Sequence, residues 1–159
     1  TFIGYVNQSF PDGFFGLGGL HLAGDVLTRQ IPSPALALAG QPAPVRDVVV
    51  YRPPAFANTN RSFPIVYFLG GYGQDPADYS RMGDLLDVLI GLGAVQNMYF
   101  AFLPGSGGHR GSFSVNHRIP DSQAPGLASP TSGRYEDSIL QDLMPEIESN
   151  LLGGRVRSH

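Results

Sequence analysis

An almost uninterrupted apolar run at residues 63–69, FPIVYFL, constrains the fold of this chain more than any other feature. A strand that is apolar at nearly every position is typical of a sheet covered on both faces, because a half-exposed strand alternates apolar with polar residues. The run ends at Gly70-Gly71-Tyr72-Gly73. Glycines directly after a strand indicate a tight turn. The sequence therefore predicts a buried strand that ends in a tight glycine turn.

Further strands and helices are predicted on both sides of this run. β-branched and aromatic residues, with prolines at the ends, predict strands at residues 26–31, 45–52 and 98–103. Apolar residues spaced by three or four predict helices at residues 75–94 and 134–152. Pro145 is expected to interrupt and kink the second helix. From residue 45 onward, the order strand, strand, helix, strand, helix predicts an α/β fold with a partly parallel sheet and helical crossovers.

The predicted elements make only part of a sheet. Two or three buried strands leave more apolar edge open than a stable domain tolerates. Residues 153–159 follow the last helix and have the composition of a linker toward another strand. We therefore expect residues 1–44 to form an N-terminal strand and loop extension, and residues 45–159 to form half of a doubly wound sheet. A further segment or chain would complete it.

Composition excludes several classes of function. The chain has no cysteine, and all ten of its basic residues are arginine. Thiol nucleophiles, thiolate zinc sites, Walker phosphate loops and Schiff-base lysines are therefore excluded. A net charge of -3 argues against a nucleic-acid partner. No apolar stretch is long enough for a membrane span, and no paired-histidine spacing indicates a metal site. No cofactor is indicated.

Four segments of the sequence form a recognisable series. They are VVVYRPP at 48–54, FPIVYFLGGYG at 63–73, GSFSVN at 111–116, and the helix at 135–148 that runs from YED to QDLMPEIE. In this order they resemble the esterases of the α/β-hydrolase fold, a family that includes S-formylglutathione hydrolase, feruloyl esterases and the antigen 85 mycolyltransferases. The resemblance covers residues 45–152. One position departs from the family pattern, because Gly70 stands where the family usually has histidine.

The resemblance implies a serine carboxylesterase that works through an acyl-enzyme. It places the backbone N–H of Tyr72 in the oxyanion hole, with Gly71 and Gly73 allowing close approach of the substrate. The family's nucleophile motif, G-x-S-x-G-G, is absent from residues 1–159. The resemblance therefore implies that the Ser/His/acid triad lies in a C-terminal half of the same protein. That half would be the partner of this chain, and a small-molecule ester would be the substrate.

The long loop at residues 104–134 would border the active-site cleft in such an esterase. Within it, the residues that we expect to contact substrate are His109, Arg110, Ser112 and Phe113. Residues 104–108, PGSGG, nearly match G-x-S-x-G, but Pro104 replaces the first glycine and no helix follows, so a loop is favoured over a nucleophile. Phe113 and Tyr135 suggest an aromatic or sugar-linked ester.

Two other functions stay open at the level of sequence. An acyltransferase of the antigen 85 type would use the same chemistry with a sugar or alcohol as acceptor. A non-catalytic binding module on a hydrolase fold would explain the Gly70 departure and the absence of the triad. The first residue is Thr1, which is compatible with a removed signal peptide and thus a secreted or periplasmic protein, with the cytoplasm as the alternative.

Overall fold

A computed structural model describes residues 23–37, 42–71, 73–79, 81–105, 114–117 and 133–157 of the chain. Residues 1–22 and 38–41 of the predicted N-terminal extension lie outside these ranges. None of the described helices is long and apolar enough to cross a lipid bilayer.

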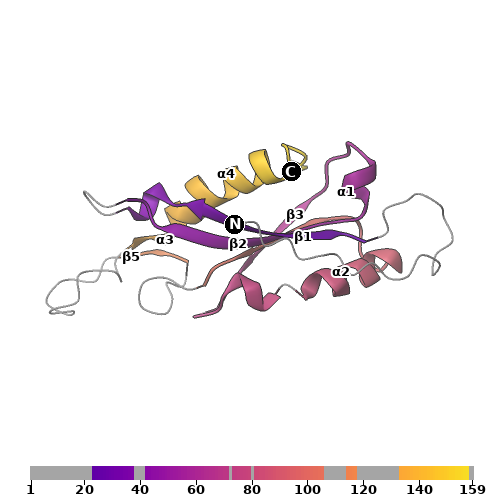
Figure 1. Cartoon of the computed structure of the whole chain (residues 1–159), viewed down its shortest axis with the longest axis horizontal. Helices are drawn as coiled ribbons and strands as arrows, with labels where there is room; N and C mark the ends of the chain where they lie inside the picture. Colours follow the sequence, from indigo (N-terminus) through magenta and orange to yellow (C-terminus); the bar gives the residue numbers. More distant parts are fainter. Residues whose placement is uncertain are drawn as a thin grey trace, which may run out of the picture.

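Four strands form one mixed sheet in the order β1-β2-β4-β3 (Figure 1). They are β1 (Asp25–Pro32), β2 (Val45–Arg52), β3 (Ile65–Leu69) and β4 (Tyr99–Leu103). β1, β2 and β4 pair antiparallel, whereas β3 and β4 pair parallel. A parallel pair needs a crossover, and helix α2 (Met82–Gly91) lies in the one between β3 and β4. The partly parallel α/β sheet predicted from the sequence is confirmed.

Short elements connect the strands. They are the 3-10 turns η1 (Pro34–Leu36) and η2 (Pro76–Tyr79), the single-turn helix α1 (Ala55–Asn58), and the two-residue strands β5 (Asn116–His117) and β6 (Gly133–Arg134), which pair with each other. The single helix predicted over residues 75–94 is therefore two elements, η2 and α2.

The last helix is continuous but changes its hydrogen-bond pattern along its length. Its segments are α3 (Tyr135–Asp137), the π-helical η4 (Ser138–Leu143), α4 (Met144–Glu146) and the π-helical η5 (Ile147–Leu151). The helix continues past Pro145, with π-helical turns before and after the short α segment that contains it. Wide turns leave more room for a proline ring beside the preceding carbonyls.

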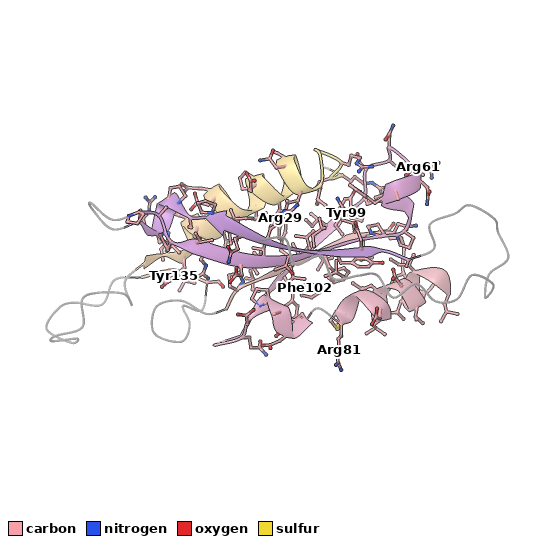
Figure 2. The ribbon with its side chains drawn as sticks, viewed as in Figure 1. Arg29, Arg61, Arg81, Tyr99, Phe102 and Tyr135 are labelled. Atoms are coloured by element: carbon pink, nitrogen blue, oxygen red, sulfur yellow. The ribbon has the colours of Figure 1, made fainter. Side chains whose placement is uncertain are left out.

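Helices cover opposite faces of the sheet, with the last helix on one side and α2 on the other (Figure 1). Residues 48–51 of β2 are all buried. Val48 and Val50 belong to a core cluster with Leu143 and Ile147 of the last helix. The alternating residue Tyr51 points the other way and donates a hydrogen bond to Asp87 of α2. Tyr99 and Phe102 of β4 likewise lie on opposite faces (Figure 2).

The third strand, β3, lies at the edge of the sheet and is only partly covered. Val66, Phe68 and Leu69 are 40–48% exposed. The expectation that this apolar run is covered on both faces is therefore wrong for the described part of the chain. The reason is its position in the strand order, since β4 is the only strand among the described residues that pairs with β3.

The chain after the last helix returns to the free side of this edge. Phe63, just before β3, forms a parallel bridge with Val156. Its N–H donates to Arg155 O at 3.0 Å, and its carbonyl accepts from Arg157 N–H at 2.9 Å. The neighbouring Pro64 carbonyl instead accepts from Tyr99 N–H of β4. Because successive residues of a strand point their amide and carbonyl groups to opposite sides, residues 155–157 lie on the side of β3 away from β4.

Asp142 ties the last helix to the end of β1. Its Oδ2 accepts from the hydroxyl of Ser33 at 2.6 Å and from the N–H of Ala35 at 3.0 Å. The Ser138 hydroxyl lies 2.7 Å from that of Ser33, and both serines are buried. Asp142 is part of the QDLMPEIE motif, and these bonds give it a structural role.

Replacing Asp142 should destabilise the protein. We expect Asp142→Ala to lower the free energy of unfolding by about 3 kcal/mol, because two hydrogen bonds to a charged acceptor are lost and Ser33 is left buried without that acceptor. Glu136→Ala, an exposed acid at the start of the same helix, should cost under about 1 kcal/mol. Urea unfolding measures both values, and equal losses would contradict the role of Asp142.

Tyr67 of β3 joins the sheet edge to the last helix, since its hydroxyl donates to Glu148 Oε1 at 2.7 Å. Burial, reinforced by this hydrogen bond to the carboxylate, raises the pKa of Tyr67 well above its ordinary value. A raised pKa in the folded state stabilises the fold below the unfolded-state pKa of about 10, and this stabilisation is lost as the pH rises further.

Stability should therefore fall as the pH rises above about 10, and it should fall less steeply in Tyr67→Phe, which has one proton fewer to release on unfolding. Urea unfolding between about pH 8 and pH 11 measures the two slopes. Identical slopes would show that Tyr67 ionises equally easily in both states.

Candidate active site

The candidate site lies where the parallel strands β3 and β4 end together. Leu69 is paired with Leu103, and the N–H of Gly70 donates to the carbonyl of Leu103 at 3.1 Å. After each of these two strands the chain turns away from the sheet, at the same edge. In α/β proteins, ligands bind outside the carboxyl ends of parallel strands, where the connecting turns meet.

The two turns that leave this edge are in backbone contact. The N–H of Gly105 donates to the carbonyl of Gln74 at 3.2 Å. A Cβ on Gly105 would lie 2.0 Å from the carbonyl oxygen of Gly71 and 2.3 Å from that of Gly70. A Cβ on Gly70 would in turn lie 2.8 Å from the Gly105 nitrogen. Only glycine fits where the two backbones approach this closely.

Within the first turn, two of the predicted site residues can be placed. Gly73 has a φ of 76°, a left-handed conformation that favours glycine. The N–H of Gly71 donates to the side-chain oxygen of Gln74 at 2.6 Å, so this amide already has an acceptor. Tyr72 lies outside the described residues, and its role as oxyanion donor stays a prediction.

Gln74 is a site residue that the sequence alone did not reveal. Its side-chain oxygen also accepts from the hydroxyl of Tyr79 at 2.5 Å, and its N–H donates to the carbonyl of Gly71 at 3.0 Å. Tyr79 belongs to η2, which follows the turn. Nothing in the pattern of polar residues distinguishes this glutamine, because its partners become neighbours only when the turn has formed.

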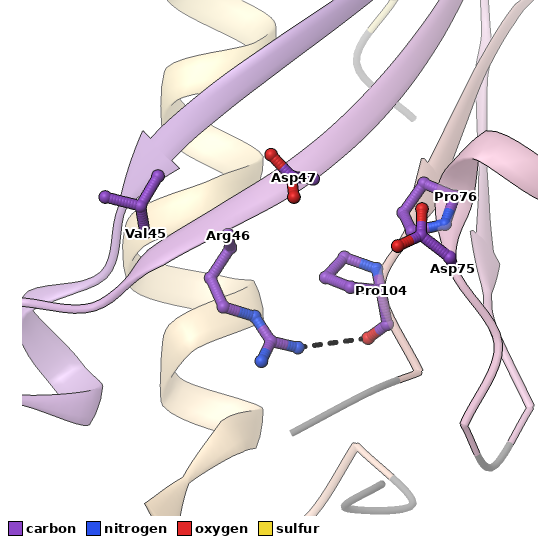
Figure 3. Close-up of a pocket in the computed structure, with 6 residues that line it drawn as sticks. All are labelled: Val45, Arg46, Asp47, Asp75, Pro76 and Pro104. Atoms are coloured by element: carbon purple, nitrogen blue, oxygen red, sulfur yellow. Dashed lines mark hydrogen bonds between the residues drawn. The ribbon is translucent and has the colours of Figure 1, made fainter. Parts of the chain in front are cut away.

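Arg46 is a second such residue, and it lies beside the other turn (Figure 3). Its Nη2 donates to the carbonyl of Pro104 at 3.1 Å, and its guanidinium lies 5.6 Å from the ring centroid of Tyr135. Burial lowers the pKa of Arg46, while Tyr135 and Asp47 oppose that shift. An arginine stays protonated in proteins even so, and Arg46 therefore places a positive charge at this edge of the sheet.

A small polar pocket opens beside Arg46 and Pro104. Its lining residues are Val45, Arg46, Asp47, Asp75, Pro76 and Pro104 (Figure 3). Its volume of about 70 Å³ is well below the roughly 300–1,000 Å³ of a pocket that encloses an organic ligand. This pocket is therefore too small to enclose an organic ligand.

Several predicted residues cannot be placed. His109, Arg110, Ser112 and Phe113 lie outside the described residues, as does Ser106, the serine of the PGSGG segment. Tyr135, suggested as an aromatic substrate contact, is only 6% exposed and lies beneath Arg46. Its ring is therefore a packing surface, and the suggestion is wrong for this residue. The described residues include no group of three or more metal-ligating side chains.

Several solved structures are similar to this chain in fold. The chain is similar to a ferulic acid esterase, with a TM-score of 0.58 and 20% identity over 84% of this chain and 45% of the other. A ferulic acid esterase from Anaeromyces mucronatus, solved with ferulic acid, gives a TM-score of 0.52 and 15% identity over 89% of this chain and 48% of that protein. For an IroE-like serine hydrolase from Shewanella oneidensis the TM-score is 0.51 and the identity is 20%, over 83% of this chain and 40% of that protein. This chain therefore shares its fold with part of each of these proteins.

The chain spans less than half the length of each of these proteins, as expected for the N-terminal half of such a fold. No protein-family model and no curated protein matches the sequence. The resemblance inferred from the motifs is therefore confirmed by structural similarity, at the level of the fold.

The close contact between the two turns predicts the effect of one added methyl group. Gly105→Ala should lower the free energy of unfolding by about 1–3 kcal/mol, because the new Cβ would overlap two backbone oxygens that cannot move independently of the sheet. Gly91→Ala is the matched control, since a Cβ added there would have nothing within 4 Å and alanine favours the helix by about 1 kcal/mol. Urea unfolding of both variants tests this, and a neutral Gly105→Ala would contradict the contact.

Proposed function

We propose that this chain is the N-terminal half of a serine carboxylesterase and supplies the glycine-turn side of its oxyanion hole. The observation that carries the proposal is the pair of glycine turns packed against each other at the shared carboxyl edge of β3 and β4. Backbone amides in such a turn, held by a rigid sheet, are suited to stabilise the negative charge that develops on an ester carbonyl oxygen. The similarity to esterases in fold supports this choice.

The amide of Tyr72 is the proposed oxyanion donor. The preceding amide, that of Gly71, already donates to Gln74. The next residue, Gly73, has the positive φ that reverses the chain direction. Of the amides near the tip of the turn, the one between these two residues is therefore the candidate to face a bound carbonyl.

The rest of the catalytic machinery would come from a segment that continues the sheet past β3. Residues 155–157 start a parallel pairing on the free side of the chain at Phe63. A strand that continued in this direction would cover the exposed edge of β3. It would also end at the same edge of the sheet as Gly70. A serine on the turn after such a strand would then lie beside the glycine turn, which is the position that a nucleophile needs.

In the proposed reaction, that serine oxygen attacks the ester carbonyl carbon while a histidine removes the serine proton. The histidine then gives this proton to the departing alkoxide, which leaves an acyl-enzyme. Water, deprotonated by the same histidine, attacks the acyl carbon, and the histidine returns this proton to the serine oxygen as the acyl-enzyme bond breaks and the carboxylic acid is released. The role of this chain is to bind the carbonyl oxygen in both tetrahedral intermediates. Esters of aromatic acids are the proposed substrates, because two of the similar structures are ferulic acid esterases.

Ester hydrolysis by a polypeptide that contains these residues and the segment after them tests the proposal. We expect hydrolysis of ethyl ferulate and of p-nitrophenyl acetate, inhibition by an organophosphonate, and covalent labelling of one serine beyond residue 159. Replacing that serine by alanine should abolish both activity and labelling, and residues 1–159 alone should be inactive. A longer polypeptide that folds but hydrolyses no ester would contradict the proposal and favour a binding module.

A further inference from the structure

We propose that Gln74 is the positioning residue of the glycine turn, fixing it relative to the sheet and to the turn after β4. This inference deepens the proposed esterase function and rests on it. Gln74 takes part in four hydrogen bonds, two through its side-chain oxygen and two through its backbone. These bonds join the glycine turn, η2 and the turn at Gly105.

The side-chain bonds connect the turn to the rigid part of the fold. Gln74 Oε1 accepts from Gly71 N–H at 2.6 Å and from the Tyr79 hydroxyl at 2.5 Å. The Tyr79 ring stacks on that of Phe102, with ring centroids 5.5 Å apart and an angle of 5° between the planes. Its centroid also lies 4.7 Å from that of the Phe68 ring. Phe102 and Phe68 are paired neighbours in β4 and β3. The position of the glycine turn is thereby linked to the parallel strands.

The backbone bonds close the turn and connect it to its neighbour. Gln74 N–H donates to Gly71 O, which closes the turn on itself. Gln74 O accepts from the N–H of Gly105, the residue at which an added Cβ would overlap the carbonyl oxygens of Gly70 and Gly71. On the other side, Arg46 holds the carbonyl of Pro104. The turn is therefore fixed from both strands, and the Gln74 side chain holds the amide just before the proposed oxyanion donor.

Such a restraint matters because a run of glycines is the most flexible backbone that a chain can have. An oxyanion donor stabilises the transition state only if it already points at the developing charge. Loss of the Gln74 side chain would free the Gly71 amide and let the following peptide rotate. The binding of the ground-state ester would change little, since the oxyanion exists only in the tetrahedral state. The loss should therefore appear in kcat and not in KM.

The test compares Gln74→Ala with Gln96→Ala, the same change at an exposed position beyond α2, in the longer polypeptide that contains the catalytic serine. We expect Gln74→Ala to lower kcat for p-nitrophenyl acetate by roughly tenfold with KM within about twofold, and Gln96→Ala to change neither. A Gln74→Ala kcat within about twofold of the unsubstituted protein would overturn the proposal.

Amide hydrogen exchange followed by NMR provides a readout that does not depend on activity. The Gly71 amide should exchange at least about tenfold faster in Gln74→Ala, because its acceptor is lost, and slowly again in Gln74→Glu, whose carboxylate restores an acceptor. Unchanged exchange at Gly71 in Gln74→Ala would overturn the inference even in an active esterase. Absence of esterase activity in the unsubstituted protein, with the exchange pattern as expected, would instead refute the proposed function and leave the positioning of the turn established.

Discussion

The parallel pairing of β3 with β4 is the constraint on which the rest of the structure depends. Because the two strands run in the same direction, the chain leaves the sheet twice at one edge, once at Gly70 and once at Pro104. The two exits are close enough that Gly105 packs directly on the carbonyls of Gly70 and Gly71. The glycines, the crossover through α2 and the position of the candidate site all follow from this pairing.

The same pairing leaves one edge of the sheet open. The apolar residues of β3 are partly exposed because only β4 covers one side of the strand among the described residues, whereas the buried residues of β2 and β4 have neighbours on both sides. The pairing of Phe63 with Val156 begins to cover the other side. In the esterase that we propose, folding and catalysis would have a common requirement, since the strand that would shield β3 from water would also bring the nucleophile next to the glycine turn.

Most of the architecture could be predicted from the sequence, because strands and helices leave local patterns. The β-branched run at residues 45–52 became β2 without a change of bounds, and the glycines at 70–73 were correctly assigned to a turn. Burial of β3 was predicted wrongly, because an apolar composition indicates that a strand is suited to burial but does not show whether neighbouring elements cover it. Gln74, Arg46 and Asp142 were missed as contact residues, since their partners are set by the folded geometry. The loop residues His109 to Phe113 and Tyr72 lie outside the described residues and stay predictions.

A crystal structure of the longer protein after reaction with an organophosphonate would test the central claim most directly, because the phosphonyl oxygen occupies the place of the oxyanion. We predict that this oxygen lies about 2.7–3.1 Å from the amide nitrogen of Tyr72, while the Gly71 amide still donates to Gln74. A phosphonyl oxygen held by amides outside the glycine turn, or a labelled serine on a strand that does not adjoin β3, would contradict this account.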